Sequence, residues 1–288
     1  MPRRTLRCTD CGCRFDLDRE DEGRRRVRCP ECGAAVPVRS GGSRSGGSSA
    51  LMWILIILGI VGVLGVGCCA GLFWLGWSTI KPTEYPEQTQ DYADARKTFK
   101  TTLTRKGLAP QSALVGNRPA DVSEVTYTSG DLKLKAWVNR PAPGPGLKPG
   151  ALFLHGGFAF DGGDWQTSQP LRDAGFVTMT PWLRGENGQS GSYSMFYDEV
   201  DDVIAAAELL ARTPGVDPNR IFVCGHSVGG TLAMLAAMTS KRFKGCASFS
   251  GSPDQVQWSK AEEIVVPFDR NNMTEMSMRS PLAFPKSF

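Results

Sequence analysis

One stretch decides the fold: Arg220-Ile221-Phe222-Val223-Cys224-Gly225-His226-Ser227-Val228-Gly229-Gly230. Its apolar first half predicts a strand, and the small and apolar residues after the serine predict a helix. The glycines on either side of Ser227 permit a sharp turn that leaves the serine side chain exposed at the carboxyl edge of a sheet. Ser227 is then expected at a helix N-terminus, where free N–H groups stabilise negative charge. The stretch predicts a nucleophile elbow in an α/β sheet.

The residues around the elbow alternate between strand-like and helix-like segments. Two strand-like runs surround Ser-Gly-Asp at 129–131 and predict a hairpin. Residues 199–212 are the clearest helix, because one face is apolar and acidic residues crowd the first turn. Strands alternating with helices predict an α/β fold with a mainly parallel sheet and helices on both faces. The expected strands are 124–128, 132–138, 151–154, 176–180, 221–224 and 246–249, and the other expected helices are 165–174 and 229–239.

A second motif, His155-Gly156-Gly157-Phe158, follows the expected strand 151–154. A loop of this kind supplies one backbone N–H to an oxyanion hole, and the residue after the nucleophile supplies the other. The expected donors are therefore Gly157 or Phe158, together with Val228. Each motif alone is compatible with a tight turn, but their order and separation favour one site at one edge of the sheet.

Further runs accompany these two motifs, namely Leu152-Phe153-Leu154 before the first, Pro181-Trp182-Leu183-Arg184-Gly185, and Val216-Asp217-Pro218-Asn219 before the elbow strand. With them, residues 121–288 resemble the α/β-hydrolase fold and, within it, the catalytic domain of the prolyl oligopeptidase family and its esterase-like relatives. The resemblance implies that Ser227 is the nucleophile and that the substrate is a peptide or an ester. It also implies an acid after the next strand and a histidine after the strand beyond that.

The chain holds only two histidines, and neither is well placed to accept a proton from Ser227. His226 directly precedes the serine, so its side chain is expected to point away, and His155 belongs to a structural loop. Asp254 follows the strand after the elbow helix, but a packing or capping role is favoured there. Without a base, a serine hydroxyl is a poor nucleophile. We therefore expect a truncated version of a longer protein rather than a natural pseudoenzyme, with very weak activity in the chain as it stands.

Trp182 and Arg184 follow the expected strand 176–180, at the carboxyl edge of the sheet. They are candidates for the wall of a substrate pocket. A packed aromatic ring for the tryptophan and an ion pair for the arginine are the favoured alternatives.

The first 38 residues hold two Cys-x-x-Cys pairs, Cys8 with Cys11 and Cys29 with Cys32. Such pairs each give two thiolates to a tetrahedral Zn²⁺, so residues 1–38 are predicted to form a zinc ribbon. So short a segment has little core of its own, and a structural metal would supply its stability. Cys13 is left over and is an alternative to Cys11 as a ligand, while oxidised or idle thiols remain the other interpretation. No cofactor is expected for catalysis.

Residues 51–77 contain no charged residue over 27 positions. At about 1.5 Å per residue, a helix of this length crosses a ~30 Å hydrocarbon core; a buried core helix is the alternative. Tryptophans lie near both ends, and the many glycines are more typical of a membrane span than of a soluble helix. Arginines precede the span, so we expect a single-pass cell membrane protein with a cytoplasmic N-terminus and an extracytoplasmic hydrolase domain.

Charge and composition characterise the remaining regions. Residues 1–50 hold 11 arginines and 7 acidic residues, which accounts for the net charge of +4, and the rest of the chain is balanced. A neutral globular part offers no electrostatic reason for nucleic-acid binding. Acidic residues around the cysteine pairs favour instead a cytoplasmic protein contact through the ribbon or a role in folding alone. Residues 39–50 are expected to form a Gly/Ser linker, and residues 78–120 a proline-bearing stalk that is partly helical.

Two functional hypotheses follow. The first is a membrane-anchored serine hydrolase, a peptidase or an esterase, that acts by acyl transfer through Ser227. The second is a non-catalytic envelope protein that uses the hydrolase scaffold for binding and the ribbon for cytoplasmic contact. Reaction of Ser227 with a fluorophosphonate probe distinguishes the two, because only an activated serine reacts quickly.

Overall fold

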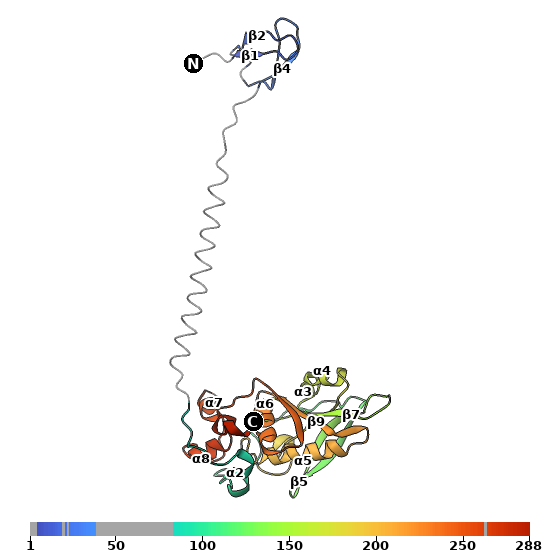
Figure 1. Ribbon diagram of the computed structural model, residues 1–288, viewed down its shortest axis with the longest axis vertical. Helices are drawn as coiled ribbons and strands as arrows, with labels where there is room; N and C mark the ends of the chain where they lie inside the picture. Colours follow the sequence, from blue (N-terminus) through green and yellow to red (C-terminus); the bar gives the residue numbers. More distant parts are fainter. Residues whose placement is uncertain (1–4, 19–20, 22, 39–82, 262–263) are drawn as a thin grey trace. The chain divides into compact units, whose positions relative to one another are not determined.

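The computed structural model describes residues 5–18, 21, 23–38, 83–261 and 264–288, and the chain divides into two compact units, Met1–Lys81 and Pro82–Phe288. The predicted linker 39–50 and membrane span 51–77 lie outside the described residues. Among the residues that are described, no helix is both long and apolar enough to span a bilayer. Figure 1 labels many of the helices and strands of the two units.

The described residues of the smaller unit form two β-hairpins (Figure 1, blue). Strand β1 (Thr5–Arg7) pairs antiparallel with β2 (Arg14–Asp16), and β3 (Arg26–Arg28) pairs antiparallel with β4 (Ala35–Pro37). A domain of fewer than about 40 residues needs disulfides, a metal or a partner to be stable, because its core is small. Among the described residues of this unit, the buried core consists of Cys8, Leu17, Val27, Cys29 and Val36.

The larger unit is built on a six-stranded sheet with the order β10-β9-β7-β8-β6-β5. Strands β8, β7, β9 and β10 run parallel to one another, and β5 and β6 add an antiparallel hairpin at one edge. The mainly parallel sheet predicted from the alternation of strands and helices is therefore confirmed. The strands are β5 (Val122–Ser129), β6 (Leu132–Asn139), β7 (Lys148–Leu154), β8 (Val177–Pro181), β9 (Val216–His226) and β10 (Phe243–Phe249).

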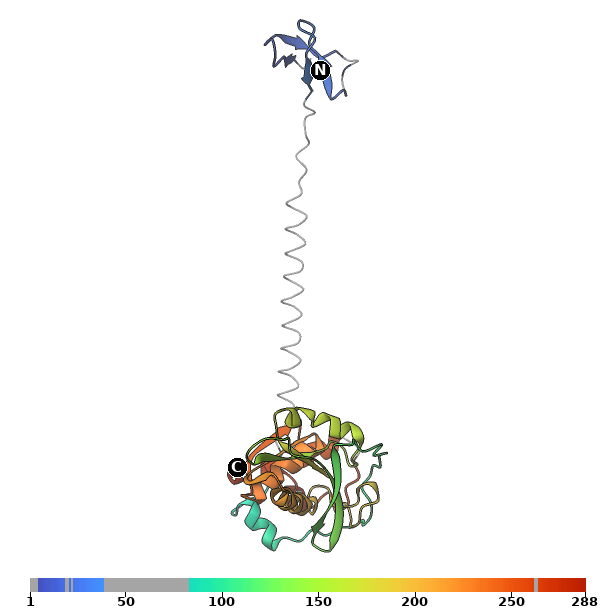
Figure 2. The same cartoon turned by 90° about the vertical axis from the view of Figure 1, so that its right-hand side faces the viewer.

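Helices cover both faces of this sheet (Figures 1 and 2). Ile221 and Val223 of β9 belong to the main hydrophobic core, which also contains the apolar residues of α5 and α6. Cys224, on the opposite face of β9, lines an apolar pocket with Leu171 of α4. Side chains that alternate between two buried faces are typical of an inner strand of a parallel sheet. The covering helices are α3 (Gly162–Thr167), α4 (Gln169–Asp173), α5 (Glu199–Arg212) and α6 (Val228–Thr239).

The predicted helix 165–174 is in fact two short helices, α3 and α4, which meet at Ser168. Asp161 starts α3 earlier than predicted, because it forms a capping box with Asp164. Pro170 has no N–H to donate to the preceding turn, and it lies at the start of α4, where a helix tolerates proline. By contrast, α5 spans the predicted residues 199–212.

The residues before the sheet, 83–120, pack within the larger unit, although the sequence predicts a stalk there. Helix α2 (Tyr92–Thr98) places Tyr92 in the core, where its hydroxyl donates to the Met278 carbonyl at 2.8 Å. The Arg96 guanidinium donates to the Tyr197 carbonyl at 2.8 Å and forms an ion pair with Asp201. The unit also contains the short helices α7 (Gln255–Ala261) and α8 (Met273–Ser277), and 3-10 turns at Glu186–Gly188, Pro281–Ala283 and Pro285–Ser287.

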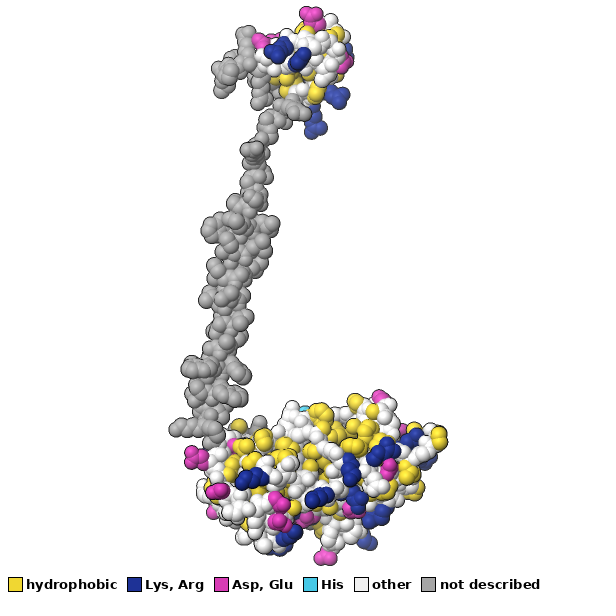
Figure 3. All heavy atoms as spheres, in the orientation of Figure 1, with side chains coloured by type: hydrophobic (Ala, Val, Ile, Leu, Met, Phe, Trp, Pro, Cys, Tyr) yellow, Lys and Arg dark blue, Asp and Glu magenta, His cyan; other side chains and the backbone are white. Residues whose placement is uncertain are grey.

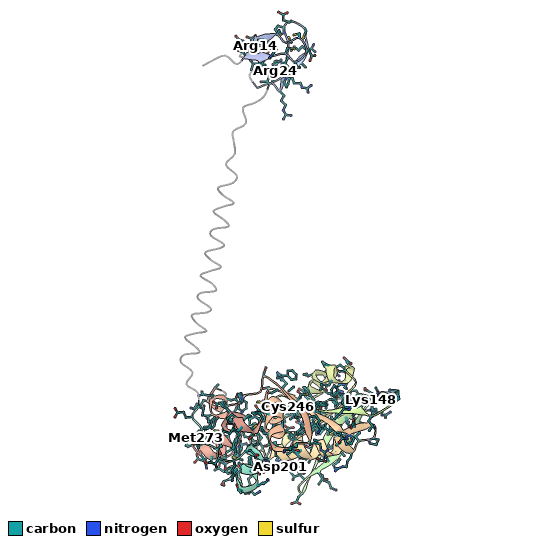
Figure 4. The ribbon with its side chains drawn as sticks, viewed as in Figure 1. Arg14, Arg24, Lys148, Asp201, Cys246 and Met273 are labelled. Carbon is teal, nitrogen blue, oxygen red and sulfur yellow. The ribbon has the colours of Figure 1, made fainter. Side chains whose placement is uncertain are left out.

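Strand β10 forms one edge of the sheet in the part of the chain that the structure describes. Most of its residues are exposed, including Cys246, which Figure 4 labels, and Phe249 at 56% exposure. Hydrophobic side chains are visible over much of the larger unit in Figure 3. An exposed edge strand with apolar side chains is a site where another strand can pair.

Candidate active site

Ser227 lies between the end of β9 and the first turn of α6. Its backbone has φ 52° and ψ −117°, which residues other than glycine rarely adopt. The Ser227 N–H donates to the Phe249 carbonyl at 2.8 Å, and the Ser227 carbonyl accepts from the N–H groups of Gly230 and Thr231 at 2.9 and 3.1 Å. The strained turn is therefore held on both sides, as the predicted nucleophile elbow requires.

Two glycines of the elbow are required by packing. A Cβ on Gly225 would lie 2.3 Å from the Gly229 carbonyl oxygen, and a Cβ on Gly229 would lie 2.1 Å from the Leu154 carbonyl oxygen. Both distances are far below van der Waals contact, and the obstacles are backbone atoms that cannot rotate away. The tight fit brings the end of β7, and with it the loop at 155–158, against the elbow.

Val228 is the first residue of α6, so its N–H has no acceptor within the helix. The helix dipole adds partial positive charge at the same point. Ser227 is half-buried and Val228 is buried. A negative oxygen beside Ser227 would therefore meet a backbone donor in a partly desolvated place.

The loop after β7 places the other predicted donors, Gly157 and Phe158. Gly157 has φ 67°, which favours glycine. The Phe158 N–H donates to the side-chain oxygen of Gln111 at 2.7 Å, and a Cβ on Gly157 would lie 2.7 Å from the same oxygen. One predicted donor is thus occupied by a side chain from the segment before the sheet. Sequence reasoning missed Gln111, because no local pattern marks a glutamine in an irregular segment.

His155 is buried, and both of its ring nitrogens are engaged. Nε2 lies 3.0 Å from Oε2 of Glu186, and Nδ1 lies 3.1 Å from the Gly156 carbonyl. Burial lowers the pKa of His155, but the charge and hydrogen bond of Glu186 outweigh burial and raise it to about 9. Glu186 also accepts from the Leu183 N–H at 2.9 Å, so the pair ties the loop after β7 to the turn after β8.

His226 is exposed and lies beside the oxyanion loop rather than on the serine hydroxyl. A Cβ on Gly156 would be 3.0 Å from its Nδ1. The ring borders an apolar pocket of about 270 Å³ with Phe153, Leu171 and Phe249 among its walls. Within the described residues, no hydrogen bond joins Ser227 Oγ to either histidine.

Asp254, the acidic residue considered as a third member of a triad, is held by hydrogen bonds that stabilise the fold. Oδ1 of Asp254 accepts from the Tyr85 hydroxyl at 2.6 Å and from the N–H groups of Val256 and Gln257 at 3.0 and 3.1 Å. Asp254 therefore caps α7 and anchors Tyr85, which is the capping role that the sequence favoured.

Trp182 and Arg184 are both built into the protein interior. Trp182 stacks on Phe160 with ring centroids 5.6 Å apart and belongs to a small separate cluster. Arg184 donates from Nε and Nη2 to the two oxygens of buried Asp202, at 2.9 and 2.6 Å. Arg184 also borders a small interior pocket that Phe158 and Val228 share. Its charge is already paired with Asp202, as the ion-pair alternative requires.

The smaller unit holds four cysteines in an arrangement that can hold a metal ion. The Sγ atoms of Cys8, Cys11, Cys29 and Cys32 all lie within 4.8 Å of one another. The Cys8–Cys32 and Cys11–Cys29 sulfur distances are both 3.6 Å. Four thiolates at about 2.3 Å from a tetrahedral metal lie roughly 3.8 Å apart, so the donor set fits Zn²⁺. Arg14 and Arg24, labelled in Figure 4, project from this unit.

Comparison with known proteins supports the assignment of the fold. Residues 164–283 match the prolyl oligopeptidase family. The "Uncharacterized peptidase YtmA" of Bacillus subtilis (strain 168) is 29% identical over 168 residues, which cover 56% of this chain and 60% of that protein. The acylaminoacyl peptidase of Pyrococcus horikoshii has a TM-score of 0.50 and 22% identity, over 58% of this chain and 30% of that one.

The larger unit therefore has an α/β-hydrolase fold, and its residues 164–283 are similar to the prolyl oligopeptidase family. Ser227 lies inside the matched residues 164–283, whereas the oxyanion loop at 155–158 precedes them. The chain spans 60% of the Bacillus protein and 30% of the Pyrococcus enzyme.

Proposed function

We propose that this protein is a serine hydrolase of the prolyl oligopeptidase type that acts on a peptide or an ester. The observation that carries the proposal is the strained backbone of Ser227 at the N-terminus of α6. A non-glycine residue with positive φ costs free energy, and such strain is retained where it positions a functional side chain. The family match to residues 164–283 supports the same reaction class.

The proposed reaction is acyl transfer. Oγ of Ser227 attacks the substrate carbonyl, and the proton passes to a base. The N–H of Val228 and that of Gly157 or Phe158 stabilise the oxyanion, the leaving group departs with the proton, and water then releases the acyl group. Neither His155 nor His226 is placed to act as the base, so we propose that a histidine outside these 288 residues supplies it.

Fluorophosphonate labelling tests the proposal. We expect slow labelling of the chain at Ser227 and none in the Ser227→Ala variant, because the serine is positioned but lacks its proton acceptor. Added imidazole should increase the labelling rate of the parent chain and leave the variant unlabelled. Labelling that does not depend on Ser227, or no labelling at any imidazole concentration, would leave the non-catalytic scaffold as the better hypothesis. Rapid stoichiometric labelling without imidazole would contradict the missing base.

We also propose that residues 51–77 anchor the protein in the cell membrane, with the hydrolase domain outside the cytoplasm. The support is the absence of charge over 27 residues and the arginines that precede them. Protease added to sealed vesicles of known orientation tests this topology. A C-terminal tag that proves to be cytoplasmic would contradict it.

For the smaller unit we propose a structural Zn²⁺ bound by Cys8, Cys11, Cys29 and Cys32. The support is the separation of the four sulfurs and the small core around them. When bound, the metal would hold the two hairpins together, and it would take no part in acyl transfer. The unit would then offer a cytoplasmic contact for another protein, and no nucleic-acid partner is proposed. Metal analysis of the purified chain should find about one zinc per chain, lost in the Cys29→Ser, Cys32→Ser double variant.

A further inference from the structure

The side-chain amide of Gln111 occupies part of the proposed oxyanion site. Its Oε1 atom accepts a 2.7 Å hydrogen bond from the Phe158 N–H and would lie 2.7 Å from a Cβ on Gly157. A carboxamide oxygen is an acceptor of the same kind as the carbonyl oxygen of a peptide. The oxygen of Gln111 therefore lies against both loop residues that are candidates for binding a substrate carbonyl.

We propose that residues 107–115 form an inhibitory segment, in which the Gln111 carboxamide stands in for the substrate carbonyl and must leave before a substrate binds. The inference rests on the proposed hydrolase function. It identifies what controls access to that site.

Backbone hydrogen bonds hold the first part of this segment against the turn after β8. The Ala109 N–H donates to the Gly185 carbonyl at 3.0 Å, and the Tyr193 N–H donates to the Gly107 carbonyl at 2.9 Å. A Cβ on Gly185 would lie 3.2 Å from the Ala109 nitrogen, so the inhibitory segment lies close against the turn after β8. This pairing places Gln111 only two residues beyond an anchored position.

Asn187 holds the second part of the segment. Its Oδ1 accepts from the Ala113 N–H at 3.0 Å, and its Nδ2 donates to the Phe160 carbonyl at 2.7 Å. One side chain thus joins the inhibitory segment to the chain that follows the oxyanion loop. Asn187 has φ 44°, a conformation that asparagine tolerates better than most residues. The anchors at Ala109 and Ala113 lie on either side of Gln111 and direct it at Phe158.

Part of the apolar surface of the segment is exposed, although Ala109 and Val115 pack, partly buried, against core clusters. Leu114 is 95% exposed and Leu108 is 60% exposed, and Gln111 itself is largely exposed. Because hydrogen bonds and limited packing at Ala109 and Val115 hold the segment, it can leave without unfolding the sheet. Loss of the single Gln111 contact corresponds to about a three- to tenfold change in the population of the open site.

The test compares substitutions with opposite expected effects. Gln111→Ala removes the acceptor, so labelling of Ser227 by a fluorophosphonate in the presence of imidazole should become about three- to tenfold faster. Gln111→Glu supplies a charged and stronger acceptor for the Phe158 N–H, so labelling should become slower than in the parent chain. Gln88→Ala is the matched control at a glutamine outside residues 107–115, because its side-chain amide hydrogen-bonds to the Pro86 carbonyl and not to the oxyanion loop. It should label at the parent rate.

A second measurement does not depend on catalysis. Amide hydrogen exchange at Phe158, followed in a Ser227→Ala background, should become faster when Gln111 is replaced by alanine and stay unchanged with Gln88→Ala. Equal or slower labelling of Gln111→Ala would overturn the inference, as would unchanged exchange at Phe158. If no variant labels above the Ser227→Ala background, the proposed hydrolase function fails, and exchange at Phe158 then decides alone whether Gln111 occupies the donor.

Discussion

Nε2 of His155 lies 3.0 Å from Oε2 of Glu186, and both side chains are buried. The pair joins the loop that carries Gly157 to the turn that carries Asn187, so it supports the two sides of the candidate site. Because Glu186 raises the pKa of His155 to about 9 against the effect of burial, the ring is a cation at neutral pH. A cation held by a carboxylate cannot accept the proton of Ser227, which explains physically why this histidine is structural.

The pair predicts a pH dependence of stability. The pKa of His155 in the folded state, about 9, exceeds the ~6.5 of an unfolded histidine, so its stabilisation is complete below pH ~6.5 and is lost as the pH rises through about 9. Replacing Glu186 by glutamine should lower the free energy of unfolding by about 1–3 kcal/mol at pH 6, with a smaller difference at pH 9.5. Urea unfolding at both pH values measures the change.

The control is Asp217→Asn at an exposed ion pair. Arg220 lowers the pKa of Asp217, so that group does not titrate between pH 6 and 9.5. Its substitution should leave the slope of stability against pH unchanged in this window. If Glu186→Gln loses the same free energy at both pH values, the charge on His155 is not the cause.

A methyl group at Gly229 should destabilise the elbow. The added Cβ would lie 2.1 Å from the Leu154 carbonyl oxygen and 2.5 Å from that of His155, and neither backbone atom can rotate away. We expect Gly229→Ala to lower the free energy of unfolding by about 3 kcal/mol, at the upper end of the range for overpacking. Thermal unfolding measures this loss. Gly245→Ala is the control, because its nearest obstacle is the Phe222 ring at 3.2 Å, and a melting temperature equal for both variants would refute the packing argument.

The sheet and the elbow could be predicted from the sequence because their signals are local. The apolar run at 221–224 and the glycines around Ser227 lie within ten residues, and packing then requires what the pattern indicates. Helix α5 has its apolar face and acidic first turn in one continuous stretch, so both of its ends were predictable. The break between α3 and α4 at Ser168 was harder to predict, because a capping box and a proline interrupt the helical periodicity there.

The docking of residues 83–120 could not be predicted from the sequence, because it depends on contacts across most of the chain. Tyr92 meets Met278, and Gln111 meets Phe158, across separations of 186 and 47 residues. The local sequence is polar and proline-bearing, which is typical of a linker. Only the folded sheet creates the surface that accepts these side chains, so the candidate inhibitory segment is visible only in the structure.

Docking of α2 predicts that its buried tyrosine contributes to stability. Tyr92→Phe keeps the ring but leaves the Met278 carbonyl without the 2.8 Å hydrogen bond from the tyrosine hydroxyl. Because that carbonyl loses a buried donor, we expect a loss of about 1–3 kcal/mol in the free energy of unfolding. Lys97→Ala on the exposed side of α2 should cause no measurable change. A free stalk would make both substitutions neutral, and urea unfolding distinguishes the two cases.

The spare cysteine of the smaller unit should not be a metal ligand. Sγ of Cys13 lies 3.0 Å from Sγ of Cys29, closer than the roughly 3.8 Å that separates two thiolates on one tetrahedral metal. Cys13 is therefore placed to contact the Cys29 sulfur as an S–H donor while Cys11 completes the site. We expect Cys13→Ser to bind one Co²⁺ with the absorption spectrum of a four-sulfur site, and Cys11→Ser to lose that spectrum. If Cys11→Ser keeps a four-sulfur spectrum and the Cys11→Ser, Cys13→Ser double variant loses it, Cys13 can take the place of Cys11.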